Sequence, residues 1–252
     1  MNTRWAGWVE SLLVFAALCG LWWAASHGQW VSKVFLPTPE ATLGSLVEGL
    51  QKGDLLAYTA ATVQRMFWGW GLACVLGLLL GALVGSSATA RAWVQPTLEL
   101  IRPLPASAVM PLAISIFGLS GSMVLAVVAF GAMWPVLLAT VHGLAGVHLR
   151  LREVSQALQL SRLAFLFKIG LPNALPDILS AMRLSLTVAL IVAVVGEMLA
   201  SQDGLGLAIL QAARSFRASE LFAGIALLGA IGFVSNTLLA SLERRLMPWQ
   251  PA

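Results

Sequence analysis

The feature that most constrains this chain is the length of its uncharged segments. Between Arg102 and Arg150 there is no Lys, Arg, Asp or Glu. A helix needs about 20 apolar residues to cross the roughly 30 Å hydrocarbon core of a bilayer. Only 10% of the residues are charged and 59% are hydrophobic, whereas soluble domains carry about 25% charged residues. The sequence therefore predicts an all-α membrane protein.

We expect six transmembrane helices. The GLSGS turn at 118–122 divides the long uncharged segment into a third and a fourth helix. The other four expected spans cover residues 11–26, 66–90, 178–200 and 221–242. Five spans are the nearest alternative. For the first span a cleaved signal peptide is a second reading, since Arg4 precedes a short apolar core that ends in AAS.

These spans divide the chain into three parts. Residues 1–58 hold the first span and an outer segment, residues 59–245 hold a core of five spans, and residues 246–252 form a tail. A polar loop at about 142–177 lies between the fourth and fifth spans. In the outer segment, Thr38 is a typical N-cap, and Pro39 and Glu40 suit a first turn. This pattern predicts a short amphipathic helix at the membrane surface.

The basic residues indicate the orientation of the spans. Cytoplasmic loops carry an excess of Lys and Arg, so we interpret the net charge of +4 as a topology signal and not as a nucleic-acid site. With both termini in the cytoplasm, the outer loops hold Lys33, Lys52, Arg214 and Arg217. The inner segments then hold Arg4, Arg91, Arg102, Arg150, Arg152, Arg162, Lys168, Arg244 and Arg245.

Motifs of common catalytic and cofactor sites are absent from the sequence. There is no GxxxxGK[ST] phosphate loop and no HExxH, CxxC or GxSxG motif. The three histidines lie at predicted span ends, and Cys19 and Cys74 lie in apolar runs without a pairing pattern. We therefore expect no catalytic residue, no metal site and no enzymatic activity in this chain.

The loop between the fourth and fifth spans is the most informative segment. From Arg150 to Phe167 it has neither Gly nor Pro, and it mixes apolar with charged residues. This pattern predicts helical structure outside the bilayer. Phe165, Leu166 and Phe167 would be exposed unless something covers them. The loop is either a solvated helix beneath the membrane or a docking surface for a soluble subunit.

Residues of this loop resemble the EAA motif of the permease subunits of ABC importers. The matching elements are Glu153-Val154-Ser155, Gln159 at the motif's glycine position, and Ile169-Gly170-Leu171-Pro172 at the motif's spacing. Segments in the same order along the chain resemble the nitrate/sulfonate/taurine branch of that family. They are LPTPE at 36–40, IRPLPASAVMPLAISIFGLS at 101–120, VVGEMLASQDGLG at 194–206 and LERRL at 242–246.

The resemblance implies a six-helix permease of a type I importer in a bacterial inner membrane. Its implied partners are a cytoplasmic ATPase dimer, an extracytoplasmic solute-binding protein, a second permease copy and membrane lipid. ATP and Mg would bind the partner ATPase, and this chain would hold no cofactor. The implied cargo is a small anion, with a pyrimidine or other heteroaromatic vitamin precursor as the alternative. From another class, a stand-alone secondary transporter would need inverted repeats and midplane charges, which the sequence does not display.

By the same resemblance, the loop forms a coupling helix that contacts the ATPase. Its candidate residues are Glu153, Val154, Ser155, Ala157, Gln159, Ile169, Leu171 and Pro172. Gln159 departs from the family, because a glycine there would allow a tight turn with positive φ. Either the turn is made differently or the coupling helix continues further. Leu171 and Leu175 precede prolines, so we expect a boundary there, with Pro176 opening the fifth helix.

Several residues within the spans are candidates for the translocation pathway. An acid in a span is costly and is a functional candidate; for Glu197 we weigh a fold or gating role against direct substrate contact. Prolines near the start of the third span interrupt hydrogen bonding, so we place that segment against the bundle interior. The pathway candidates are Pro105, Ser107, Pro111, Ser115, Thr140 and Glu197. Gly77, Gly81 and Gly85 predict close helix packing.

Overall fold

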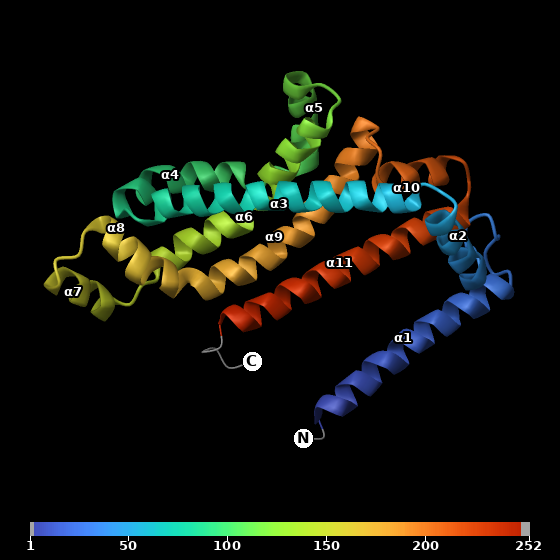
Figure 1. The fold of residues 1–252 in the computed structure, drawn as a ribbon, viewed down its shortest axis with the longest axis horizontal. Coiled ribbons are helices and arrows are strands. Elements are labelled where there is room, and N and C mark those ends of the chain that lie inside the picture. Colours follow the sequence, from blue (N-terminus) through green and yellow to red (C-terminus); the bar gives the residue numbers. More distant parts are fainter. Residues whose placement is uncertain (1–2, 248–252) are drawn as a thin grey trace.

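The protein is an elongated bundle of long helices. The structure is a computed structural model that describes residues 3–247, and all regular elements within that range are helical (Figure 1). In chain order they are α1 (Thr3–His27), α2 (Pro39–Gln51), α3 (Leu55–Gly85), α4 (Ala88–Ile101), α5 (Ala106–Phe117), α6 (Gly121–Ala145), α7 (Leu149–Ala157), α8 (Arg162–Phe165), the π-helical turn η1 (Leu166–Gly170), α9 (Leu171–Ala200), α10 (Leu205–Arg214) and α11 (Ala218–Leu246).

Four helical segments within the described range are long and apolar enough to cross a membrane. They are α3, α6, the run Arg162–Ala200 formed by α8, η1 and α9, and α11. A fifth candidate is the pair α4 and α5, which meet at 93°. The first expected span lies within α1. The all-helical membrane fold is therefore confirmed, and the count of six spans stays a prediction.

The core lies where α3, α6 and α9 pack together. α6 is the central helix, and most of its side chains are buried. The predicted glycine face of α3 is confirmed: a Cβ atom on Gly81 would lie 2.6 Å from Cβ of Thr140, and one on Gly77 would lie 2.9 Å from Cβ of Val136. These glycines let the backbones of α3 and α6 approach closely, as small residues do in membrane helices.

The region after α3 differs from the sequence prediction. Between the expected span 66–90 and the uncharged segment after Arg102, the chain forms the additional helix α4, which runs back along α3 (Figure 1). Ser87 caps α4 by accepting a hydrogen bond from the Ala90 N–H at 3.3 Å. The third span is then interrupted near Pro105, so α5 has only 12 residues. The Gly118–Ser122 turn is confirmed, with Gly118 at φ 66° and Ser120 capping α6.

The N-terminal part is attached to the bundle at one end. Thr38 caps α2 as predicted, accepting from the Ala41 N–H at 3.2 Å. Backbone hydrogen bonding, the largest cause, lowers the pKa of the Glu40 carboxyl. The indole N–H of Trp22 donates to the Pro37 carbonyl at 2.9 Å, and its ring stacks on Phe222 of α11. The rest of α1 extends away from the other helices (Figure 1). The predicted tail, 246–252, lies largely outside the described residues.

Candidate functional site

The predicted docking loop forms one end of the molecule, where α7 and α8 lie (Figure 1). Polar contacts attach α7 to the last turn of α6. The Arg152 guanidinium donates to the carbonyl oxygens of Ala145 at 2.7 Å and Leu144 at 3.4 Å. These carbonyls would otherwise lack a partner at the helix end. The buried Ser155 hydroxyl donates to the Arg152 carbonyl at 2.7 Å. This attachment turns Ser155 inward and leaves Glu153 exposed.

α7 ends in a turn that shows how Gln159 replaces glycine. The Gln159 N–H donates to the Gln156 carbonyl, and the Leu160 N–H donates to the Ser155 carbonyl, each at 3.0 Å. This pair of bonds is a Schellman motif, in which the residue after the cap is left-handed. Gln159 has φ 49°. The turn therefore keeps a glycine-like conformation with a glutamine in it, and the alternative of a longer coupling helix is wrong.

The return from the loop into the membrane is more helical than the sequence predicts. Ser161 caps α8, and the π-helical turn η1 follows, in which the Leu171 N–H donates to the Leu166 carbonyl. Pro172 lies in the first turn of α9, and Pro176 lies inside that helix. The expected boundary at Leu175 is therefore wrong. A proline within the first turn needs no N–H bond, and the wide turn before Pro172 is typical of a π-bulge.

Both arms of the loop meet the same point on α6. Arg152 reaches the Leu144 carbonyl from α7. On the other arm Gly170 is buried, and a Cβ atom there would lie 2.7 Å from Cδ2 of Leu144. Of the candidate coupling residues, Ile169 and Leu171 are half-buried beside this point, and Pro172 is exposed. The structure thus brings the two halves of the motif to the end of α6.

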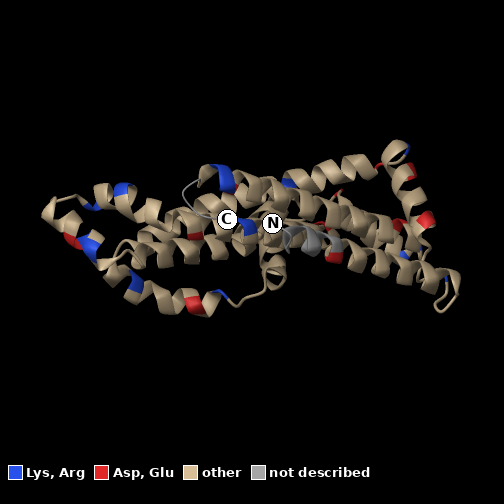
Figure 2. Cartoon of the chain, turned by 90° about the horizontal axis from the view of Figure 1, so that it is seen from below, with Lys and Arg blue, Asp and Glu red and all other residues tan. Residues whose placement is uncertain are grey.

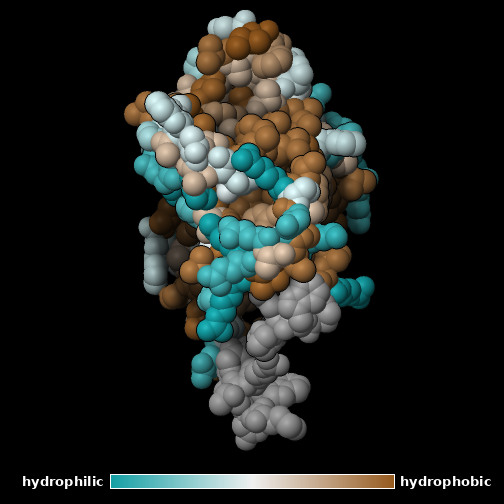
Figure 3. Space-filling view, turned by 90° about the vertical axis from the view of Figure 1, so that its left-hand side faces the viewer, coloured by the Kyte–Doolittle hydropathy of each residue, from teal (hydrophilic) through white to brown (hydrophobic). Residues whose placement is uncertain are grey.

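The outer face of the loop has several exposed apolar side chains. Val154 is 50% exposed and Leu158 is 66% exposed. Glu153, Ala157 and Gln159 are exposed beside them. Other exposed apolar side chains of the loop are Leu149, Leu151, Leu163 and Phe167. Figure 3 looks onto this end of the molecule, where hydrophobic and hydrophilic residues are mixed. Such a mixture of apolar area and one acidic group suits contact with a soluble protein.

At the opposite end of α9, Glu197 is fully buried and has a complete set of partners. Its carboxylate accepts from the Arg65 guanidinium at 2.8 Å, the Thr62 hydroxyl at 2.9 Å and the Gly206 N–H at 3.0 Å. Arg65 also donates to the Asp203 carbonyl at 2.5 Å. The network joins α3, α9 and the start of α10. This geometry favours the fold or gating role of Glu197 over direct substrate contact.

The partners of Glu197 were not identified from the sequence. Neither Arg65 nor Thr62 is among the candidate residues named from the sequence. A signal was present, since Arg65 and Glu197 are opposite charges within otherwise apolar segments and such charges are usually paired.

The other pathway candidates do not form one site within this chain. Pro105, Ser107, Pro111 and Ser115 are exposed along α5, while Met110 and Ala113 of the same helix pack into the core. The prolines therefore do not face the interior of this chain's own bundle, contrary to the prediction. Thr140 is fully buried, and its hydroxyl donates to the Val136 carbonyl at 2.7 Å. Its side chain fills the α3–α6 interface beside Gly81.

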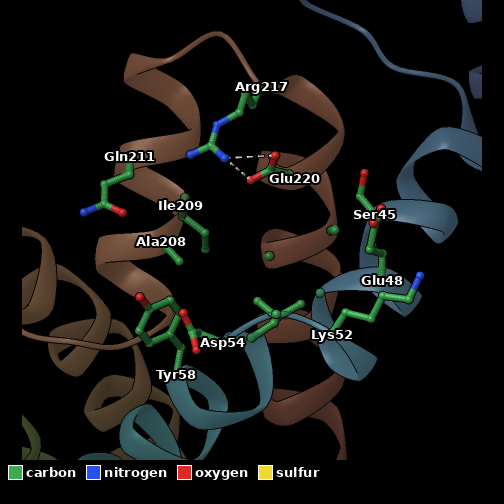
Figure 4. A pocket seen from close by; sticks show the side chains of 15 residues that line it. Ser45, Glu48, Lys52, Asp54, Tyr58, Ala208, Ile209, Gln211, Arg217 and Glu220 are labelled. Atoms are coloured by element: carbon green, nitrogen blue, oxygen red, sulfur yellow. Dashed lines mark hydrogen bonds and ion pairs between the residues drawn. The ribbon is translucent and has the colours of Figure 1, made fainter.

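A cavity of about 460 Å³ lies at the end of the molecule away from the loop. It is formed by α2, the start of α3, α10 and the start of α11 (Figure 4). Its charged lining residues are Glu48, Lys52, Asp54, Arg217 and Glu220. Arg217 and Glu220 form an ion pair at 2.8 Å. Both signs of charge are present, so the cavity has no marked preference for anions or cations.

The chain is similar to known proteins over most of its length. Residues 73–248 match the family described as binding-protein-dependent transport system inner membrane component. SsuC of Bacillus subtilis (strain 168), named for aliphatic sulfonates transport, is 33% identical over 97% of this chain and 88% of its own length. The taurine transport system permease protein TauC of Escherichia coli (strain K12) is 31% identical over 95% of this chain and 89% of its own. The nitrate import permease protein NrtB of Leptolyngbya laminosa is 25% identical over 95% and 88%.

Proposed function

Because this chain belongs to the family of binding-protein-dependent transport system inner membrane components, we propose that its α7–α8 loop couples a cytoplasmic ATPase to solute import. The chain is the permease subunit of an ABC importer, a multi-pass inner-membrane protein without catalytic function of its own. ATP hydrolysis then takes place on the partner, which binds ATP and Mg. The coupling helix is α7, and Glu153 is its acidic contact.

The observation that carries this proposal is the exposed face of α7. Val154 and Leu158 are half or more exposed, next to Glu153. A soluble partner that covers this face removes apolar area from water and gives the carboxylate a basic or hydrogen-bonding partner. The loop joins α6 and α9, both of which pack in the core.

The connection from the loop to the pathway runs along α9. From Arg162 to Ala200 the chain is one continuous helical segment. Within it, η1 has π-helical instead of α-helical hydrogen bonds. A displacement of the docked α7 passes through α8 and Pro172 into this helix. Because Glu197 joins the far end of α9 to α3 and α10, the displacement also reaches the opposite end of the bundle.

We further propose that the cargo is a small anion of the nitrate, sulfonate or taurine kind. Three relatives over most of the chain are named for sulfonates, taurine and nitrate. These names favour an anion over a pyrimidine or other heteroaromatic precursor, and the family membership argues against a stand-alone secondary transporter. Candidate pathway residues are Ser107 and Ser115, which are exposed on α5. They would line a route between this chain and a second copy.

The remaining partners follow from the same assignment. An extracytoplasmic binding protein delivers the solute at the end where α2 and α10 lie, and both termini are cytoplasmic. Figure 2 shows several blue segments at the α7–α8 end, whereas blue and red segments are mixed at the opposite end. That distribution supports a cytoplasmic position for the loop.

The proposal is tested with Glu153→Lys. The variant is expected to lose co-purification with the cognate ATPase and to lose ATP-dependent uptake of radiolabelled taurine or nitrate in proteoliposomes. The matched control is Glu99→Lys, at an exposed acid on α4 outside the loop; it is expected to retain both. Equal uptake and equal ATPase recovery in the two variants would contradict the coupling role. Uptake that continues without ATP would contradict the importer assignment.

A further inference from the structure

A second cavity lies directly behind the coupling loop. Its volume is about 420 Å³, and its walls come from the turn between α3 and α4, the end of α6, α7 and α8. Ser86, Ser87 and Gln156 of α7 are among its lining residues. The cavity therefore sits between the loop that meets the partner and the helices that enter the membrane.

The charges around this cavity are all positive. Arg91 of α4, Arg152 of α7 and Arg162 of α8 line it, and among the described residues no Asp or Glu does. The guanidinium of Arg91 donates to the Gly85 carbonyl at a long 3.4 Å. Arg152 bonds to carbonyl oxygens, while its buried Nε has no partner among the described residues. No carboxylate in the described part of the chain pairs with any of the three.

In two other cavities of the described structure, a lining arginine is paired with a carboxylate. Arg217 is paired with Glu220 in the cavity at the far end. Arg183, in the groove between α9 and α11, is paired with Glu243. The cavity behind the loop differs from both, because arginines of three helices line it and none of them is paired with a carboxylate of the described residues. Such an arrangement is repulsive when empty and favourable when an anion occupies it.

We propose that this cavity is a binding site for an oxyanion of the phosphate or sulfonate type. Guanidinium groups bind such oxygens with paired, charge-assisted hydrogen bonds. The hydroxyls of Ser86 and Ser87 and the amide of Gln156 are further polar groups in the lining. The oxyanion belongs either to a lipid head group or to a free ion from the same aqueous side. Both sources present the same chemistry to the arginines.

A bound oxyanion would have a mechanical consequence. Arg91 belongs to α4, whereas Arg152 and Arg162 belong to the loop. One anion that contacts all three would connect α7 and α8 to the helices at the membrane. It would hold the coupling loop more rigidly than the bonds of Arg152 to α6 do alone. The anion site itself rests on the cavity and its charges and does not depend on the transport assignment.

The free-ion form is tested by titrating the purified protein, in an uncharged detergent, with inorganic phosphate at constant ionic strength. The unfolding temperature of the wild type is expected to rise as the phosphate concentration increases. Arg162→Gln and Arg91→Gln are each expected to weaken the apparent affinity about tenfold or more, because a charge-assisted hydrogen bond is lost. The matched control, Arg150→Gln, changes an exposed arginine of α7 that does not line the cavity; it is expected to respond like the wild type.

The lipid form is tested with the same four proteins in nanodiscs of phosphatidylcholine alone or with a quarter of phosphatidylglycerol. A lipid head group in the cavity would stabilise the wild type and Arg150→Gln in the anionic nanodiscs, and would stabilise Arg162→Gln and Arg91→Gln less. A response to phosphate alone assigns the site to a free ion, and a response to the anionic lipid alone assigns it to a head group. Equal behaviour of Arg162→Gln and Arg150→Gln in both experiments would overturn the proposal, and so would an equal effect of chloride.

Discussion

At one end of the bundle Glu197 is fully buried, and Arg65, Thr62 and Gly206 satisfy its carboxylate. At the other end, α7 exposes Val154 and Leu158. The first end is closed by the chain's own contacts. The second keeps apolar side chains and unpaired arginines at its surface. We therefore expect other molecules to cover the α7–α8 end, whereas the Glu197 carboxylate is satisfied within this chain.

The largest loss of stability is expected from Arg65→Met, which removes the ion pair between Arg65 and Glu197. Glu197 would then be buried without its counter-charge, which typically costs about 3–5 kcal/mol. Reversible unfolding of the purified protein in detergent measures the loss. The exposed pair of Arg217 and Glu220 is the control, since both side chains are about half exposed; Arg217→Met is expected to cost under about 1 kcal/mol.

A double variant sharpens this prediction. Arg65→Met with Glu197→Leu removes both charges, and replacement of a buried pair by apolar residues is often close to neutral. We therefore expect the double variant to be more stable than Arg65→Met alone, with a coupling of about 1–3 kcal/mol in the mutant cycle. Additive losses would show that the two residues do not act as a pair.

The next effect concerns α3, which runs between the two ends. Gly81→Ala would place a Cβ atom 2.6 Å from Cβ of Thr140 and 2.8 Å from the Leu137 carbonyl. Separating α3 from α6 to admit it is expected to cost about 1–3 kcal/mol. Gly71 of the same helix has open space at its Cβ position, so Gly71→Ala is expected to leave stability unchanged or raise it by up to about 1 kcal/mol. Comparable destabilisation in both variants would mean that the α3–α6 packing is not the cause.

The smallest effect is expected at the open end. A non-glycine residue in the left-handed conformation is destabilised by about 1 kcal/mol. Gln159→Gly is expected to remove this cost. Amide exchange of α7 is expected to slow slightly in this variant. Gln156→Gly, inside the same helix, is the control and is expected to speed that exchange. Faster exchange in Gln159→Gly would show that the turn is not strained.

Local features of this fold were predictable because they depend on neighbouring residues. Thr38 followed by Pro39 identified the start of α2, and the turn at Gly118 separated α5 from α6. The glycines spaced by four on α3 predicted a close helix contact. Each of these signals requires only the conformational properties of residues within a few positions of each other.

Other features depend on contacts that a sequence pattern does not contain. Arg65 and Glu197 are 132 positions apart, so their pairing follows from the packing of α3 against α9. Pro176 lies inside α9, five positions after its first residue, so the packing of the helix and not the preference of proline sets that boundary. The left-handed Gln159 is held by the hydrogen bonds that end α7, which override the residue's own preference.

Amide hydrogen exchange of the permease with and without its cognate ATPase tests the central claim most directly. The coupling account predicts that exchange slows in Leu149–Gln159 when the ATPase is added, because the exposed face of α7 becomes covered. Exchange in α10, at the closed end, is expected to change little. Binding of the ATPase with unchanged exchange in Leu149–Gln159 would contradict the assignment of α7 as the coupling helix.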